Sequence, residues 1–215
     1  MSRELETEKL KRKLGTLYLK SFVEELYLDG KLTEKDLQSP EKISEILSEF
    51  DFEKASITIS VDHRNSLLGR AKIFMNEGKT DLAFVFFGTF FEHSINFLIA
   101  EVLSKKNISI KTKNEIIRSL NIRSKFSWFL EVLGFPKFNQ KHLKTILSVA
   151  ENRNAFIHYK YNYEDIEIDK TEERNELLEA AEKSAIYTKR YISKVVYDGK
   201  KVKVKGKLDE LFKDP

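Results

Sequence analysis

Hydrophobic residues recur along most of the chain at the three- and four-residue spacing of amphipathic helices. Glycines, prolines and capping side chains interrupt this pattern and mark the expected helix ends. The pattern predicts helices over residues 3–28, 39–50, 62–77, 80–105, 111–120, 124–134, 138–157 and 171–195. Two stretches differ: ASITISV at 55–61 alternates like a short strand, and VVYDGKKVKV at 195–204 predicts a β-hairpin around Asp198 and Gly199.

The segment 80–105 is the most apolar of the chain, and its phenylalanines fall on several faces of the predicted helix, as in a central helix that others surround. These residues are Phe84, Phe86, Phe87, Phe90, Phe91 and Phe97. Gly88 in this segment indicates a close approach of another helix. Glu92 interrupts the apolar run, and a carboxylate in such surroundings needs a partner or a raised pKa. Arg153, His93 or a lysine are the alternatives for that partner, and we favour a supporting structural role for Glu92.

The length of 215 residues suits one main domain with a smaller appendage. The chain has only 3 prolines and 8 glycines, which argues against disorder and against a turn-rich β fold. We therefore expect a mainly all-α protein, with an N-terminal helical extension over residues 1–55. A helical bundle over residues 56–215 would follow and end in the small C-terminal hairpin.

Several classes of site are excluded by composition. The chain has no cysteine, so disulfides, thiolate nucleophiles and cysteine-ligated metal sites are ruled out. The N-terminus lacks the apolar core of a signal peptide. The longest apolar run, 82–91, is shorter than the roughly 20 residues that a membrane-spanning helix needs. These features predict a soluble, cytoplasmic protein without a membrane partner.

The net charge of +4 is too small to identify a nucleic-acid binder by itself. Residues 189–207, however, are rich in lysine and contain a single acid, Asp198, whereas residues 164–182 are strongly acidic. The lysine-rich stretch could attract a polyanion locally, or it could be a solvated edge. Both readings stay open.

A polar cluster, ENRNAFIH at 151–158, ends the helix predicted at 138–157. Asn154 and His158 are four residues apart and therefore neighbours on a helix, and Arg153 lies one residue back. A guanidinium matches phosphate oxygens, and an imidazole can give or take a proton near neutral pH. Together they suffice for attack of a ribose 2′-hydroxyl on the adjacent phosphate, without a metal. The alternative is a surface or interface pair that only holds helices together.

This cluster resembles the ribonuclease motif of the HEPN superfamily, in which an Arg, a polar residue, three further positions and a His end a bundle helix. The motif stands here as RNAFIH at 153–158. The preceding helices, NSLLGRAKIFMNEGK and the long apolar helix with its internal acid, follow the same order. The resemblance covers about residues 62–195 and leaves out the first 55 or so.

The resemblance implies a homodimer of all-α bundles whose Arg/His motifs form one composite endoribonuclease site, with neither metal nor cofactor. Arg153 would bind the scissile phosphate, His158 would be the acid or base, and Asn154 would orient one of them. Members of the superfamily are typically toxins of toxin–antitoxin pairs or effectors of antiphage defence. The expected partners are therefore RNA, a second copy of the chain, and an antitoxin or other regulatory protein.

Tyr159, Lys160 and Tyr161 follow the motif directly. They are candidate RNA-binding residues because aromatic rings stack on splayed bases, while packing of this loop on the bundle is the alternative. In HEPN toxins that a nucleotidyltransferase silences, a tyrosine two residues after the His accepts nucleotides. Here that position is Lys160, which puts this mode of control in question.

Two functions of different classes remain after the sequence is read. The first is a metal-independent endoribonuclease acting as a toxin or in antiphage defence. The second is a non-catalytic module of the same fold that binds nucleic acid, a nucleotide or a partner protein. A weaker third option is a helical subunit that pairs with a separately encoded nucleotidyltransferase.

Overall fold

The computed structural model describes residues 2–28, 30–49, 62–158, 171–197 and 200–212. Every regular element within these ranges is a helix, which confirms the prediction of a mainly all-α protein. The chain separates into two compact units, one made of Met1–Ile59 and Tyr197–Pro215 and the other of Ser60–Val196. Each unit has its own hydrophobic core.

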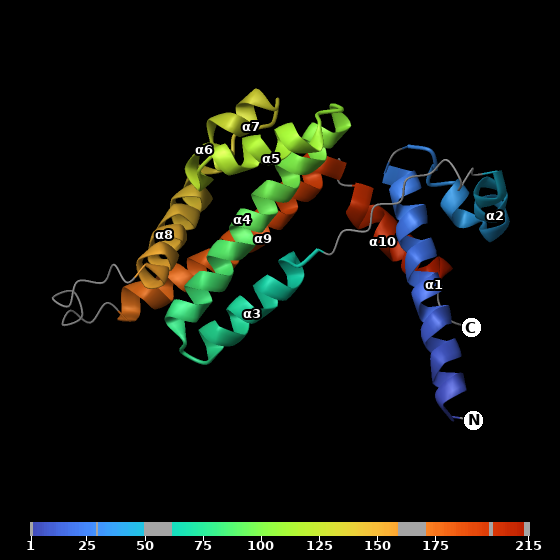
Figure 1. The fold of residues 1–215 in the computed structure, drawn as a ribbon, viewed down its shortest axis with the longest axis horizontal. Coiled ribbons are helices and arrows are strands. Elements are labelled where there is room, and N and C mark those ends of the chain that lie inside the picture. Colours follow the sequence, from blue (N-terminus) through green and yellow to red (C-terminus); the bar gives the residue numbers. More distant parts are fainter. Residues whose placement is uncertain (1, 29, 50–61, 159–170, 198–199, 213–215) are drawn as a thin grey trace. The chain divides into compact units, whose positions relative to one another are not determined.

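The first unit combines both ends of the chain. It contains α1 (Ser2–Leu28), the 3-10 helix η1 (Asp36–Gln38), α2 (Pro40–Glu49) and α10 (Lys200–Leu211), with α10 packed beside α1 (Figure 1). Its buried residues are Val23, Leu26, Tyr27, Leu32, Leu37, Ile43, Val204 and Leu208. The N-terminal helices therefore close their core with a helix from the other end of the chain.

The hairpin predicted at 195–204 is wrong. Residues up to 197 belong to α9 and residues from 200 onward to α10, while Asp198 and Gly199 lie outside the described residues. Val204 and Leu208, one helical turn apart, are both about 1% exposed in the core of the first unit. Their burial on one helix face outweighs the local turn preference of the Asp-Gly pair. The strand predicted at 55–61 also lies outside the described residues.

The second unit is a helical bundle. Its long helices are α3 (Arg64–Asn76), α4 (Thr80–Lys105), α8 (Gln140–Ile157) and α9 (Thr171–Tyr197), and the short helices α5 (Ile110–Ser119), α6 (Ile122–Phe126) and α7 (Trp128–Val132) gather at one end (Figure 1). The helix predicted at 124–134 is divided at Ser127. The Ser127 side chain does not cap α7 but donates a hydrogen bond to the carbonyl of Arg123. The break lets Phe126 and Phe129 both reach the core.

Helix α4 is the centre of this bundle, as its sequence predicted. The helices α3 and α8 pack along it, and α9 adds buried side chains to the same core. Phe84, Phe87, Phe90 and Phe91 are at most 1% exposed. By length and composition alone α4 could cross a membrane, but 56% of its most apolar stretch is buried inside the bundle. That burial is expected for a central bundle helix.

Candidate functional site

The polar cluster of the sequence lies on the last turn of α8, where this helix passes close to α4. Gly88 of α4 faces Arg153, and a Cβ atom added at Gly88 would come within 2.9 Å of the Arg153 Cδ atom. Any side chain at position 88 would therefore displace the arginine. The glycine marks a close approach between helices, and the approach is to Arg153 itself.

The guanidinium of Arg153 is held by two side chains. Its Nη1 donates to Glu92 Oε2 at 2.8 Å, and its Nε and Nη2 both donate to Asn154 Oδ1, at 3.2 and 3.1 Å. Arg153 is thus the partner of Glu92, one of the alternatives that the sequence left open. The Arg153 side chain is 19% exposed and that of Glu92 40%, so the pair lies at the edge of the bundle rather than in its core. These bonds fix the plane of the guanidinium while its remaining N–H groups stay available to a ligand.

His158 caps the same helix one turn later. Its backbone N–H donates to the carbonyl of Asn154 at 3.0 Å, and its side chain is exposed. Among the described residues, no hydrogen bond or ion pair joins the imidazole to Arg153, Asn154 or Glu92. One chain therefore joins the side chains of Arg153, Asn154 and Glu92 by hydrogen bonds, and within the described residues the exposed imidazole of His158 is not part of that network. Tyr159, Lys160 and Tyr161 lie outside the described residues.

Lys125 on α6 is a charged neighbour that the sequence did not reveal. It is only 3% exposed, and no hydrogen-bond or ion-pair partner for it occurs in the described part of the chain. Burial lowers the pKa of Lys125, and the negative charge of Glu92 partly counteracts that shift. A lysine between Ser124 and Phe126 looks like ordinary surface. The only available signal was its place beside an aromatic residue that had to be buried.

One acidic and two basic side chains interact here. Arg153 is hydrogen-bonded to Glu92, and the charge of Glu92 acts on Lys125. Two cations that interact with a single carboxylate leave these three groups with one net positive charge when all of them are ionised. Such an excess favours an anionic ligand, because the electrostatic interaction is stronger where water is partly excluded. The geometry and the charge are both suited to a phosphate.

His142 lies on the first turns of α8, at the opposite end from Arg153. Its Nδ1 is 3.0 Å from the Oγ of the buried Ser184, and its ring stacks on Tyr187 with centroids 4.3 Å apart. Burial, and then the charge of Lys141, lower the pKa of His142. This histidine is a packing residue of the α8–α9 interface.

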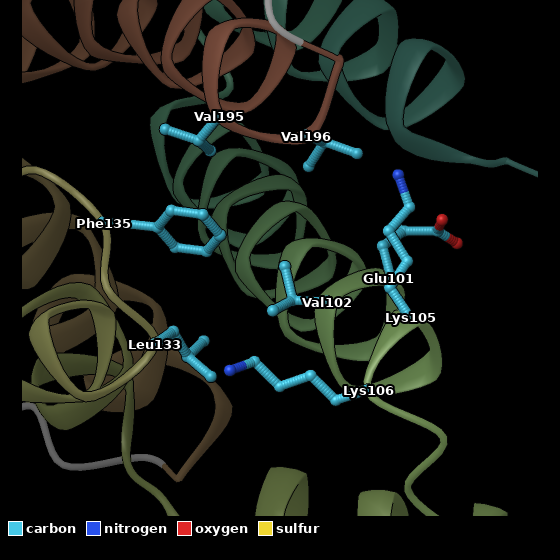
Figure 2. Close-up of a pocket in the computed structure, with 8 residues that line it drawn as sticks. All are labelled: Glu101, Val102, Lys105, Lys106, Leu133, Phe135, Val195 and Val196. Carbon is cyan, nitrogen blue, oxygen red and sulfur yellow. The ribbon is translucent and has the colours of Figure 1, made fainter. Parts of the chain in front are cut away.

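A pocket of about 260 Å³ opens at the far end of α4. Figure 2 shows its mainly apolar wall and the side chain of Lys106 reaching across toward Leu133. The lining residues are Glu101, Val102, Lys105, Lys106, Leu133, Phe135, Val195 and Val196. Val102 is 14 residues beyond Gly88, or roughly 21 Å along the helix. The pocket is therefore separate from the cluster around Arg153.

No family model matches the chain, and neither the curated proteins nor the solved structures include one that is significantly similar to it. The residues and their geometry are consequently the basis for any functional conclusion.

Proposed function

We propose that the chain is a metal-independent endoribonuclease of the HEPN type, built on a HEPN-like bundle and acting in the cytoplasm as a toxin or antiphage effector. The observation that carries the proposal is the anchoring of Arg153. Its guanidinium is oriented by Glu92 and Asn154, with Gly88 allowing its stem to lie against α4, and an exposed histidine follows one turn later.

The chemistry follows from these groups. A base removes the proton from a ribose 2′-hydroxyl, whose oxygen then forms a bond to the adjacent phosphorus. The bond from phosphorus to the 5′-oxygen breaks, and that oxygen takes a proton from an acid. Arg153 would bind the phosphate oxygens as negative charge gathers on them, and His158 would carry one of the protons. The products are a 2′,3′-cyclic phosphate and a 5′-hydroxyl.

A second copy of the chain is part of this proposal. In one chain the His158 side chain makes no hydrogen bond or ion pair with the Arg153 group within the described residues, and one imidazole cannot be base and acid in the same step. Two copies with their α8 ends together would supply two imidazoles and two guanidinium groups around one phosphate. The functional unit proposed is thus a homodimer with a composite site.

The direct test is cleavage of single-stranded RNA by the purified protein in EDTA. His158→Ala should lower the rate by about 10²- to 10⁴-fold, the usual contribution of an acid or base. The matched control is His63→Ala, because His63 is exposed at the start of α3. Equal rates for the wild type and His158→Ala would remove the catalytic claim. Growth arrest on expression, relieved by His158→Ala, tests the toxin role.

One observation favours the alternative, a non-catalytic module of the same fold that binds nucleic acid, a nucleotide or a partner protein. The bond from Arg153 to Glu92 already links α8 to α4 within one chain, so the arginine has a structural use. In that case the wild type would not cleave RNA, and Arg153→Ala would lower the stability of the bundle. Thermal unfolding beside the cleavage assay separates the two functions.

A further inference from the structure

Helix α1 has two apolar faces, and only one of them is covered within its unit. Val23, Leu26 and Tyr27, near its C-terminal end, are at most 6% exposed and belong to the core of the first unit. Leu10 and Leu17, nearer the N-terminus, are 58% and 53% exposed. An exposed apolar stripe on a helix marks an interaction surface more often than an isolated exposed leucine does.

The exposed leucines form a single line. Leu10, Leu14 and Leu17 are spaced by four and three residues, so that at about 100° per residue they lie within about 60° of one another. The centre of this line is more than about 100° away from Val23 and Tyr27 around the helix axis. The line is thus a separate face, and a four-three spacing is the seam of a coiled coil.

We infer that this face of α1 pairs, in parallel and in register, with α1 of a second copy of the chain. The charges beside the seam select this arrangement. In a parallel pair, Glu6 lies opposite Lys11 of the partner subunit, which is attractive. In an antiparallel pair, Lys11 and Lys13 would each face their own counterparts, which is repulsive. Lys11 also pairs with Glu8 on its own helix, but both side chains are more than 60% exposed, so that pair contributes little.

The pairing has a consequence that rests on the proposed function. A seam of three leucines per helix is short, and its main effect is to keep two copies of the chain close together. Tethering raises the effective concentration of one bundle for the other, and this favours the composite site without adding a contact to it. The first unit would then control how much protein is needed for activity.

Cysteine cross-linking tests the pairing directly, because the chain has no cysteine of its own. In a parallel, in-register pair each seam residue lies beside its counterpart, within the roughly 4.4–6.8 Å between Cα atoms that a disulfide spans. Leu10→Cys and Leu17→Cys should therefore each give disulfide-linked dimers of the full-length protein on mild oxidation. Leu19→Cys is the matched control, since Leu19 is also exposed but lies on the opposite side of α1.

The outcomes are distinct. Cross-linking only in a mixture of Leu10→Cys and Leu14→Cys, which face each other when the pair is antiparallel and centred between Lys11 and Lys13, would overturn the parallel arrangement. Yields no higher than that of Leu19→Cys would overturn the inference, whether the stripe covers part of its own chain or binds another protein. Circular dichroism checks that each variant keeps its helix content. The readout needs no RNA, so a failed nuclease assay and a failed cross-link are separate results.

A second variant tests the consequence for activity. Leu14→Glu should raise the protein concentration needed for half-maximal cleavage by about tenfold or more, because the effective concentration of the second bundle is lost. Leu19→Glu should leave it unchanged. Equal concentration dependence for the two variants would show that the pairing does not serve the composite site.

Discussion

The two ends of α8 carry the same kinds of polar residue, but the surroundings of these residues differ. At the first end, His142 is hydrogen-bonded to Ser184 and stacked on Tyr187, and the nearby Tyr191 donates to the carbonyl of Pro136. At the last end, Arg153 is oriented by two partners and His158 remains exposed without a side-chain partner among the described residues.

The difference between the two ends distinguishes packing residues from residues that can bind a ligand. A polar group whose hydrogen bonds are completed inside the bundle adds to stability and has little left for a ligand. A polar group that is oriented but only partly used is ready to bind one, because its orientation costs no further entropy on binding. Substitutions at the first end of α8 should therefore change stability, and substitutions at the last end should change activity.

The largest expected contrast is between Arg153→Ala and His142→Ala. Arg153→Ala should lower RNA cleavage by about 10²- to 10³-fold, the usual cost of losing a group that stabilises transition-state charge. His142→Ala should leave cleavage unchanged at temperatures where the protein is folded but lower the melting temperature. Cleavage in EDTA and thermal melts of both variants check this, and the reverse pattern would abolish the distinction between the two ends.

At the first end, Tyr191 should produce a large pH effect on stability. Burial, and then the proximity of Tyr187, raise the pKa of Tyr191 from 10.0 to about 12. The folded state keeps this proton to a higher pH than the unfolded chain, so the free energy of unfolding should fall as the pH rises from 10 toward 12. A difference of two pKa units corresponds to about 2.7 kcal/mol. Urea unfolding of the wild type and Tyr191→Phe over this range measures it, and parallel curves would contradict the assignment.

Gly88→Ala should affect the last end without touching a polar group. The new methyl would meet the Cδ atom of Arg153, so the guanidinium must shift from Glu92. We expect cleavage to fall about tenfold, which is about 1.4 kcal/mol of transition-state stabilisation. Gly69→Ala on α3 is the control, since a Cβ atom there has no neighbour within 4 Å and should stabilise the helix by up to ~1 kcal/mol. Equal activity of the two variants would mean that the position of Arg153 is unimportant.

The smallest expected effect is on the free energy of unfolding at mildly acidic pH. Burial and the charge of Lys141 lower the pKa of His142 below 6.5. The unfolded chain therefore binds more protons than the folded state just below that pH, and the free energy of unfolding should fall as the pH decreases. His142→Phe should flatten this part of the curve, because the titrating group is then removed. Unfolding midpoints at pH 5 to 7 provide the measurement.

Much of the helical architecture could be predicted because its signals are local. Helical periodicity and capping residues gave α1, α2, α3, α4, α5, α8 and α9 close to their observed bounds. The all-round phenylalanines identified α4 as the central helix, because no other arrangement buries them. The hairpin prediction failed because the Asp-Gly signal is equally local but weaker than the burial of Val204 and Leu208.

The candidate site was predicted only as far as one helix extends. Spacing put Arg153, Asn154 and His158 at the end of α8, since residues near in sequence are near in a helix. The contact of Arg153 with Glu92, 61 residues away, was one of several alternatives. Gly88, 65 residues away, indicated a close helix approach but not that Arg153 makes it. For the buried Lys125 the only signal was its place next to Phe126, and the half-buried His142 gave none, because burial depends on which other helices cover a residue.

The sequence by itself therefore determined the helical class, the central helix and the order of the polar cluster, all of which depend on periodicities within a single element. Only the tertiary structure decided that α10 completes the core of the N-terminal helices, that Glu92 orients Arg153, and that Lys125 adds its charge nearby. These features come from packing between segments far apart in the chain, and no local preference specifies which segments meet.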